Sequence, residues 1–598
     1  MKHRFASFLP LVAVLMAASV LVTLAQNAPR DEQWKQVDDA VRKGLPKTAV
    51  ERLEPILARA VKEKKWAEAI NALGRKIALE GNVQGNKPEE KIVRLEAELK
   101  KSPAEMKPVL HTVLAHWYWQ YFQANRYRFL QRTQTASAPG KDFQTWDLPR
   151  LFAEIEKQLV TALASAETLK KIPVSDFDAL LVKGNVPDSY RPTMYDFLAH
   201  EALAFYNSGE QAAARSQTAF DLSADSPVFS DTAQFLAWKP DSKDDASPQL
   251  KAIRLYQQLL GFHAKDDDRS AWLDVDLLRM NFGKNFSFGE EKDARYKAAL
   301  KRFAEAHADH PISSRALYHQ ATVVRGEGEL VAARKIALQG KNRFPNSVGG
   351  RQCHNLIAEI EAPTVSISTE RVWNDPLPVI DVRYRNLTKV YFRVVQYDWK
   401  QRLTARGSRR PDYLDSKERL ALIGQKPVVE WSADLPATAD YHEARQEIPA
   451  RAGLKPGSYF LLSSHKQDFS ENSNRVHVCD FWVSDLALVI RNRNGQGVIE
   501  GFVLNNESGE PVVEANVNAW RGERNGWQAA GETTTDQNGF FTIRGVNRKQ
   551  LVLYARHKDQ SLATGNYYYT YLQDQKARPV TRTMFFTDRS LYRPGQTI

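Results

Sequence analysis

The stretch AEIEAPTVSIST, residues 358–369, separates two parts of the sequence that differ in hydrophobic periodicity. Before it, apolar residues recur three and four positions apart, as in EEKIVRLEAELKK (89–101) and MYDFLAHEALAFYNSGE (194–210), which predicts amphipathic helices. After it, VIDVRYRN (379–386) and similar segments alternate apolar with polar residues, which predicts β-strands. We therefore expect a multidomain chain with an α-helical region over 27–360 followed by β domains.

The β region is expected to hold two β-sandwiches, at 363–488 and 489–575. Short strands interrupted by turn-forming residues bury their inner faces by packing two sheets together. In the second sandwich, NNESGEP (505–511) is expected to turn a hairpin, and TDQNGFF (535–541) contains an Asn-Gly turn that leads into a strand. Three alternating residues between these turns are expected to face inward: Ala515, Val517 and Ala519.

An internal repeat of 34 residues lies near the end of the helical region. Ala299, Phe303, Ala306 and Pro311 recur as Ala333, Ala337, Gly340 and Pro345. In the second unit, the residues expected to face inward on a first helix are Leu317, Ala321 and Val324. Gly328 is expected to make the turn that follows. Small residues at positions where two helices approach resemble the tetratricopeptide repeat, whose period is about 34 residues. The likeness is weaker elsewhere, so we expect an irregular, tetratricopeptide-like solenoid.

The aromatic run HWYWQYFQANRYRFLQR (116–132) allows two interpretations. Its rings cover more than one face of a helix, so some of them could form an exposed binding surface. The favoured interpretation is a long helix that neighbouring helices pack on both sides, because aromatic stripes in helical repeats usually form core.

The N-terminus has the pattern of a secretory signal. MKHR is followed by an apolar stretch from Phe5 to Ala25, and small residues at its end favour cleavage before Gln26. The expectation is a signal peptide over 1–25 and an exported protein of the periplasm, cell envelope or extracellular space. The alternative is a retained anchor, since about 20 apolar residues can span a bilayer.

Two segments resemble known families. The region 497–560 resembles the carboxypeptidase regulatory-like domain, a small transthyretin-like sandwich. The sequence TDRSLYRPGQTI (587–598) closely resembles the opening of macroglobulin-like domains in the alpha-2-macroglobulin family, with the pattern D-x-x-x-Y-R-P-G-Q in this chain. Six residues match that pattern: Asp588, Tyr592, Arg593, Pro594, Gly595 and Gln596. The resemblance implies a macroglobulin-like domain at 363–488, the start of a further one at 580–598, and an exported protein that traps endopeptidases.

The chain departs from this family at its cysteines. Many members form an internal thioester from a C-x-E-Q motif, but HNL follows Cys353 and DFW follows Cys479. Neither cysteine can form that thioester, and no bait segment is identified. Protease inhibition is therefore expected of a longer parent protein of which this chain would be the N-terminal portion.

Three groups of residues invite a chemical interpretation, and none is predicted to be a catalytic, cofactor-binding or metal site. His200 and Glu201 lack the second His of a zinc-protease helix. His477 and Cys479 share one face of a strand and could be half of a metal site, but the same face continues as core. The acidic turn near Asp266 has the composition of solvated helix caps. We expect no enzyme and no cofactor.

The net charge of +12 alone could indicate a nucleic-acid partner. Lys and Arg are nevertheless interspersed with Asp and Glu, so a solvated surface and no nucleic acid are expected. The expected partners are proteases, bound by the longer parent protein, with a membrane contact only if the N-terminal segment is retained. The alternative function is a cell-envelope interaction scaffold that binds a protein partner on its helical repeats.

Overall fold

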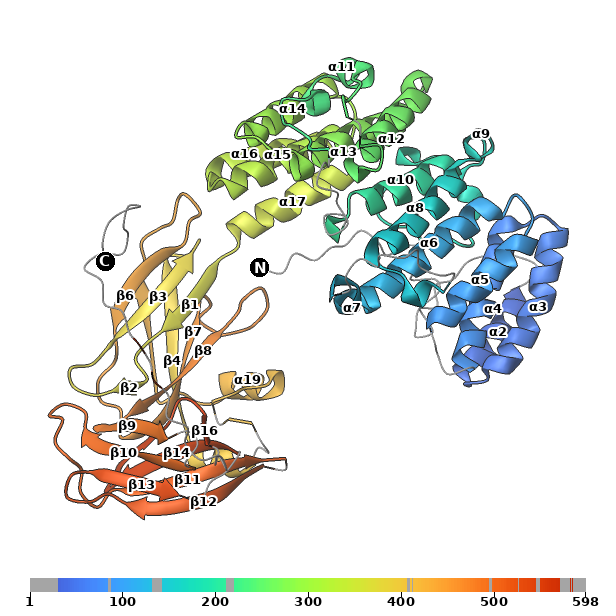
Figure 1. Cartoon of the computed structure of the whole chain (residues 1–598). Helices are drawn as coiled ribbons and strands as arrows, with labels where there is room; N and C mark the ends of the chain where they lie inside the picture. The colour runs from blue at the N-terminus through green and yellow to red at the C-terminus, as the bar shows by residue number, and fades with distance from the viewer. Residues whose placement is uncertain are drawn as a thin grey trace. The chain divides into compact units, whose positions relative to one another are not determined.

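The computed structural model describes residues 31–83, 88–131, 142–210, 220–242, 244–405, 409–410, 412–493, 497–524, 526–544, 549–570, 581 and 583. The chain forms two compact units, 1–359 and 360–598. The first contains helices and the second mainly strands, which confirms the predicted order of an α region followed by β domains (Figure 1). The predicted signal peptide and the segment D-x-x-x-Y-R-P-G-Q lie outside the described residues.

Helices of the first unit that are near one another in sequence pack together, as α3 packs on α4 and α15 packs on α16 (Figure 1). Their bounds are α2 Asp31–Arg42, α3 Pro46–Lys62, α4 Trp66–Val83, α5 Pro88–Lys101, α6 Lys107–Ala124, α7 Arg126–Gln131, α8 Leu148–Leu163, α9 Ala166–Leu169, α10 Met194–Tyr206, α11 Thr232–Ala237, α12 Pro248–Phe262, α13 Ser270–Phe286, α14 Lys292–Ala306, α15 Ser313–Gly326, α16 Leu330–Arg343 and α17 Val348–Glu361. None of the helices within the described residues combines the length and apolar content that crossing a bilayer requires.

The aromatic run on α6 forms core. Trp117, Tyr118, Tyr121 and Phe122 are at most 7% exposed and belong to the large apolar cluster of the unit. Ring contacts to α8 and to the following segment hold them, such as Phe122 on Phe152 at 5.1 Å between centroids. The packed-helix interpretation is confirmed for these rings of α6, whereas Tyr127, on α7, is 76% exposed.

The repeat region is helical at both of its units, but the units differ in detail. Gly328 makes the turn between α15 and α16 with a φ of +89°, and Leu317, Ala333 and Gly340 are buried as expected. A Cβ at Gly340 would lie 2.6 Å from Cys353 Sγ of α17, so close approach requires glycine there. Ala306, its counterpart one repeat earlier, is exposed. Val324, expected to face inward, is only half-buried.

The β unit begins with a sandwich of two sheets, ordered β1-β3-β6 and β2-β8-β7-β4-β5. Neighbouring strands are antiparallel except the short parallel pair β2 and β8. The elements are β1 Thr364–Ser368, β2 Val372–Trp373, β3 Val379–Arg385, β4 Lys389–Tyr397, α18 Trp399–Ala405, α19 Ser416–Ile423, β5 Val429–Asp434, β6 Ala444–Pro449, β7 Gly457–Ser464 and β8 His477–Val483. Alternating residues of the facing strands form its core, for example Val382, Phe392 and Phe481.

A second sandwich follows, with sheets β13-β10-β9 and β12-β11-β14-β15, and β16 pairs with β14. Its strands are β9 Leu486–Arg493, β10 Val498–Asn505, β11 Asn516–Glu523, β12 Gly526–Thr534, β13 Phe540–Arg544, β14 Lys549–His557, β15 Gln560–Ala563 and β16 Tyr568–Thr570. Strand β9 begins at Leu486, so it crosses the boundary expected at 488/489. Three residues expected to face inward are fully buried in its core: Ala515, Val517 and Ala519.

The turn expected at 505–511 is confirmed, since Asn505 N donates to Glu510 O at 2.8 Å and Val512 N donates to Val503 O at 3.0 Å. The turn reverses the chain, and Leu504 pairs with Pro511 in an isolated bridge. The next strand, β11, then joins the opposite sheet and pairs with β12 and β14. The turn at 535–541 does lead into a strand, since Gly539 has a φ of +70° and β13 starts at Phe540.

Candidate functional site

His200 and Glu201 lie on α10 inside the helical unit, at most 7% exposed. His200 Nδ1 lies 2.7 Å from the carbonyl oxygen of Asp196, one turn earlier. Glu201 Oε2 lies 2.8 Å from Nε2 of His116 on α6. Glu201 therefore connects α10 to α6, whereas this contact of His200 lies within α10. Within the described residues, His, Cys, Asp and Glu do not form a group of three or more that could hold a metal ion.

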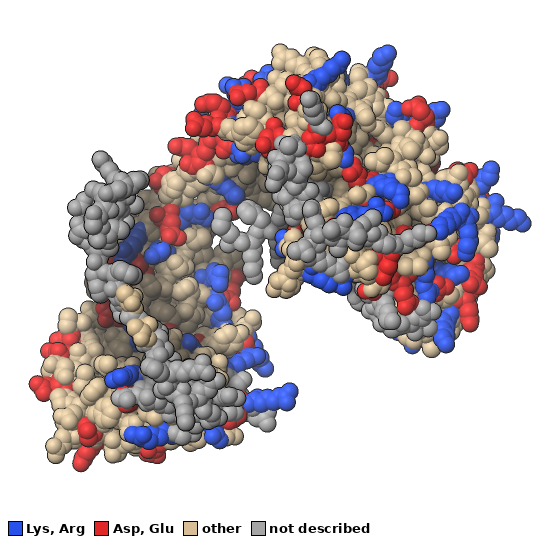
Figure 2. Space-filling view, viewed as in Figure 1, with Lys and Arg blue, Asp and Glu red and all other residues tan. Residues whose placement is uncertain are grey.

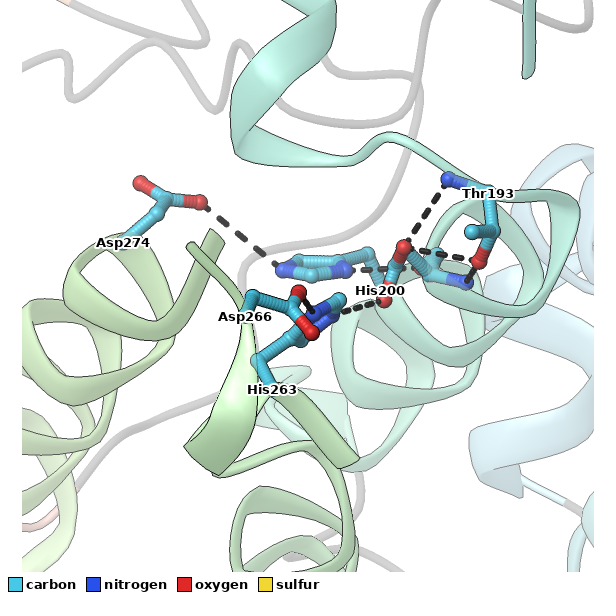
Figure 3. A network of polar contacts seen from close by, with 6 residues as sticks. Thr193, His200, His263, Asp266 and Asp274 are labelled. Atoms are coloured by element: carbon cyan, nitrogen blue, oxygen red, sulfur yellow. Dashed lines mark hydrogen bonds and ion pairs between the residues drawn. The ribbon is translucent and has the colours of Figure 1, made fainter. Parts of the chain in front are cut away.

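Asp196 is the centre of a buried polar network that joins α10 to the turn after α12 (Figure 3). Its Oδ2 accepts hydrogen bonds from Thr193 N at 2.9 Å and Thr193 Oγ1 at 2.8 Å, which caps α10. Its Oδ1 lies 2.7 Å from Nε2 of His263, in the 3₁₀ turn His263–Lys265 after α12. The acidic turn contributes as well, because Asp266 Oδ2 lies 2.6 Å from Nδ1 of His263.

The two histidines of this network have opposite electrostatic environments. Burial disfavours the charged form of His263, but its contacts with Asp196 and Asp266 outweigh that effect and raise its pKa. Only a protonated imidazole donates from both nitrogens to two carboxylates. Burial, followed by repulsion from Arg191, lowers the pKa of His200 well below its usual value. Asp196 and His263 are each 1% exposed, so the network ties helices together and offers no access to a substrate.

His477 and Cys479 lie on β8 of the first sandwich. Cys479 is partly buried and packs with Phe481 and Val483 against the core of this sandwich, as predicted for this face. His477 and Cys479 also line the pocket described below. Burial, reinforced by Asp480, raises the pKa of the Cys479 thiol to about 12. Burial raises the pKa of Cys353 to about 12 as well, so both thiols are protonated near neutral pH.

The two sandwiches are joined by a junction of buried aromatic rings and backbone contacts. Trp399 of α18 stacks on Tyr554 of β14, with ring centroids 5.4 Å apart and planes 9° apart. Arg371 donates to the carbonyl oxygen of Ala563 at 2.7 Å, and Arg410 donates to that of Gly565 at 2.7 Å. These contacts bind the end of β15 and the loop that follows it to the first sandwich.

A pocket of about 880 Å³ lies beside this junction, and we call it the basic pocket. Four arginines line it, with two aspartates and several aromatic rings. The arginines are Arg409, Arg410, Arg419 and Arg475. The pocket is the best candidate for a binding site in the β unit, since ligand pockets are typically about 300–1,000 Å³ with a few converging polar groups.

Sequence reasoning missed the basic pocket. The local signal was the run SRRPDY at 408–413, which pairs adjacent arginines with an aspartate and a tyrosine. Its other walls come from α19, which follows this run closely, and from β7, β8 and the end of the second sandwich, which are far away in sequence. Elsewhere, Figure 2 shows Lys and Arg interspersed with Asp and Glu over the face in view, as expected for a solvated surface.

Comparisons with known proteins give structural likenesses of low score. No protein-family model and no curated protein matches the chain. The crystal structure of native alpha-2-macroglobulin from Escherichia coli spanning domains NIE-MG1 matches at 16% identity and a TM-score of 0.26, covering 34% of this chain and 97% of that one. The structure spanning MG0-NIE-MG1 has the same identity and TM-score and is covered over 64% of its length.

The electron-microscopy reconstruction of the native conformation of the E. coli protein matches at 16% identity and a TM-score of 0.22, with 12% of that chain covered. With TM-scores of 0.26 or less, these likenesses do not establish the family of this chain.

Proposed function

We propose that this chain is the N-terminal portion of an exported endopeptidase inhibitor of the alpha-2-macroglobulin type, whose longer parent protein traps proteases. The observation that carries the proposal is the succession of two β-sandwiches followed in sequence by the D-x-x-x-Y-R-P-G-Q pattern at 588–596. A macroglobulin-like domain, a carboxypeptidase regulatory-like domain and a further macroglobulin-like domain would produce that succession.

The geometry of the β unit suits a mechanical role in such a protein. The ring stack of Trp399 on Tyr554 and the two arginine contacts to the β15–β16 loop hold the sandwiches together without a flexible hinge at these points. Because packed cores deform little, a movement imposed on one sandwich would be passed to the other. In this proposal, the β unit is a rigid arm, and the cleaved bait segment and the chemistry of trapping belong to the longer parent.

Capture of an active protease tests the proposal. The native protein is purified from its source cells with an antibody against residues 363–488, mixed with a broad-specificity serine endopeptidase and separated by size. We expect activity toward a small peptide substrate to elute with the antigen. Protease that has been covalently blocked at its nucleophile is the control, and it should elute at its own volume because it cannot cut a bait.

If active and blocked protease both elute alone, the inhibitor proposal is wrong. That result would favour the alternative of a cell-envelope scaffold that binds a partner through residues 27–360.

A further inference from the structure

The arginines of the basic pocket differ in how many of their hydrogen-bond donors are already used. Arg410 donates from Nε and Nη2 to Asp412 and from Nη1 to the carbonyl oxygen of Gly565. Arg419 donates to Glu471 and to the carbonyl oxygen of Val476. These two guanidinium groups are held in place by the protein.

Arg409 and Arg475 have donors to spare. Arg409 donates one hydrogen bond, from Nη1 to Asp415 Oδ2 at 3.1 Å, and a guanidinium carries five N–H groups. Arg475 is exposed, and it makes no ion pair with any residue that the structure describes. The pocket therefore presents unused N–H donors from two cationic side chains.

The charges of the pocket do not cancel. Each carboxylate near its wall already faces an arginine, as Asp412 faces Arg410 and Asp480 faces Arg371 at 3.6 Å. Arg475 adds a positive charge that has no acidic counterpart among the described residues. A cluster of cationic groups around a concave surface favours binding of an anion.

Aromatic rings orient two of the cations. The guanidinium of Arg409 lies over the ring of Tyr413 at 5.5 Å, and that of Arg410 lies over the ring of Tyr567 at 5.4 Å. A guanidinium that stacks through its flat face keeps its N–H edge for planar bidentate contacts with carboxylate or phosphate. The same rings, with Phe460, give the pocket apolar surface for the remainder of a ligand.

We propose that the basic pocket binds a small organic anion through a carboxylate or phosphate group, with Arg409 and Arg475 as the principal donors. This site is separate from protease trapping and does not depend on the proposed function. Since Arg410 and Tyr567 connect the pocket to the β15–β16 loop, a bound anion would also strengthen the junction between the two sandwiches.

Calorimetric titration of the whole chain with citrate, and separately with inorganic pyrophosphate, tests this site at 0.15 M NaCl. We expect at least one of the two probes to bind, and the tighter probe identifies the class of oxyanion. Arg475→Gln should weaken that binding about tenfold, which corresponds to the loss of one charge-assisted hydrogen bond. Arg409→Gln is a second, independent variant and should have a similar effect.

Arg556→Gln is the matched control, because Arg556 is an exposed arginine on β14 that does not line the pocket. It should leave the affinity within about twofold, since distant exposed charges are screened at this ionic strength. Failure of both anions to bind, or equal weakening by Arg556→Gln and Arg475→Gln, would overturn the proposal. Circular dichroism of each variant separates loss of binding from loss of fold.

Discussion

Replacing Trp399 by alanine should uncouple the two sandwiches. The side chain is 3% exposed and belongs to the core of the second sandwich although it lies on α18, which follows a strand of the first. Removal of a buried tryptophan costs about 3–5 kcal/mol, including about 0.5–1.5 kcal/mol for a stacked ring pair such as that with Tyr554. At about 2 kcal/mol per molar urea, the expected shift in the unfolding midpoint is roughly 2 M.

Hydrogen exchange at increasing urea, followed by mass spectrometry, measures the unfolding of each sandwich separately. Peptides from β4 and β7 report on the first sandwich, and peptides from β11 and β14 report on the second. In the wild type, both sets should lose protection at the same urea concentration. In Trp399→Ala, the second sandwich should unfold well before the first. Trp431→Ala is the control, since Trp431 stacks on Phe392 at 4.8 Å within the first sandwich and should not destabilise the second one first. Coincident transitions in Trp399→Ala would refute the coupling.

Three further results are expected. The free energy of unfolding that is lost in His263→Gln should grow as pH falls from 8 to 5.5. The raised pKa of His263 stabilises the folded state below about pH 6.5, and this contribution is lost as pH rises through the raised pKa. The free energy of unfolding that is lost in His200→Gln should shrink over the same pH range. Below about pH 6.5 His200 gains a proton in the unfolded chain but not in the folded one, so the wild type loses stability there. Parallel pH profiles for the two variants would contradict this. Gly340→Ala should cost about 1–3 kcal/mol of stability by overpacking, since the new Cβ would lie 2.6 Å from Cys353 Sγ. Adding Cys353→Ala should recover part of this loss. Additive losses of the two substitutions in thermal unfolding would count against the contact. Cys353 should not react with a thiol reagent within minutes at pH 7.5 until the chain unfolds, because the residue is fully buried and burial raises the pKa of its thiol to about 12. Fast labelling of Cys353 in the native protein would show that this thiol is accessible.

Local patterns predicted much of the fold. The change of periodicity at 358–369 falls at the boundary between the helical and β units. The alternation through Val517 placed that strand's inner face correctly, because a strand exposes its side chains on alternate sides whatever its partner. Gly328 and Gly539 were recognisable as turn residues, since both adopt positive φ values.

Pairing between distant segments was not predictable in the same way. The turn at 505–511 determines that the chain reverses, but the sheet that β11 joins depends on β12 and β14. The basic pocket likewise combines Arg409, Arg475 and Tyr567 from three separate parts of the chain. His263 and Asp196 are 67 residues apart, so no spacing rule could connect them.

The most direct test of the proposed function compares cleavage of a large and a small substrate by one endopeptidase. The native protein, purified through residues 363–488, is added in increasing amounts to the protease, and hydrolysis of a large protein substrate and of a chromogenic peptide is followed in parallel. Trapping predicts that cleavage of the large substrate falls steeply while cleavage of the peptide continues. Equal rates with and without the protein for both substrates would contradict the account.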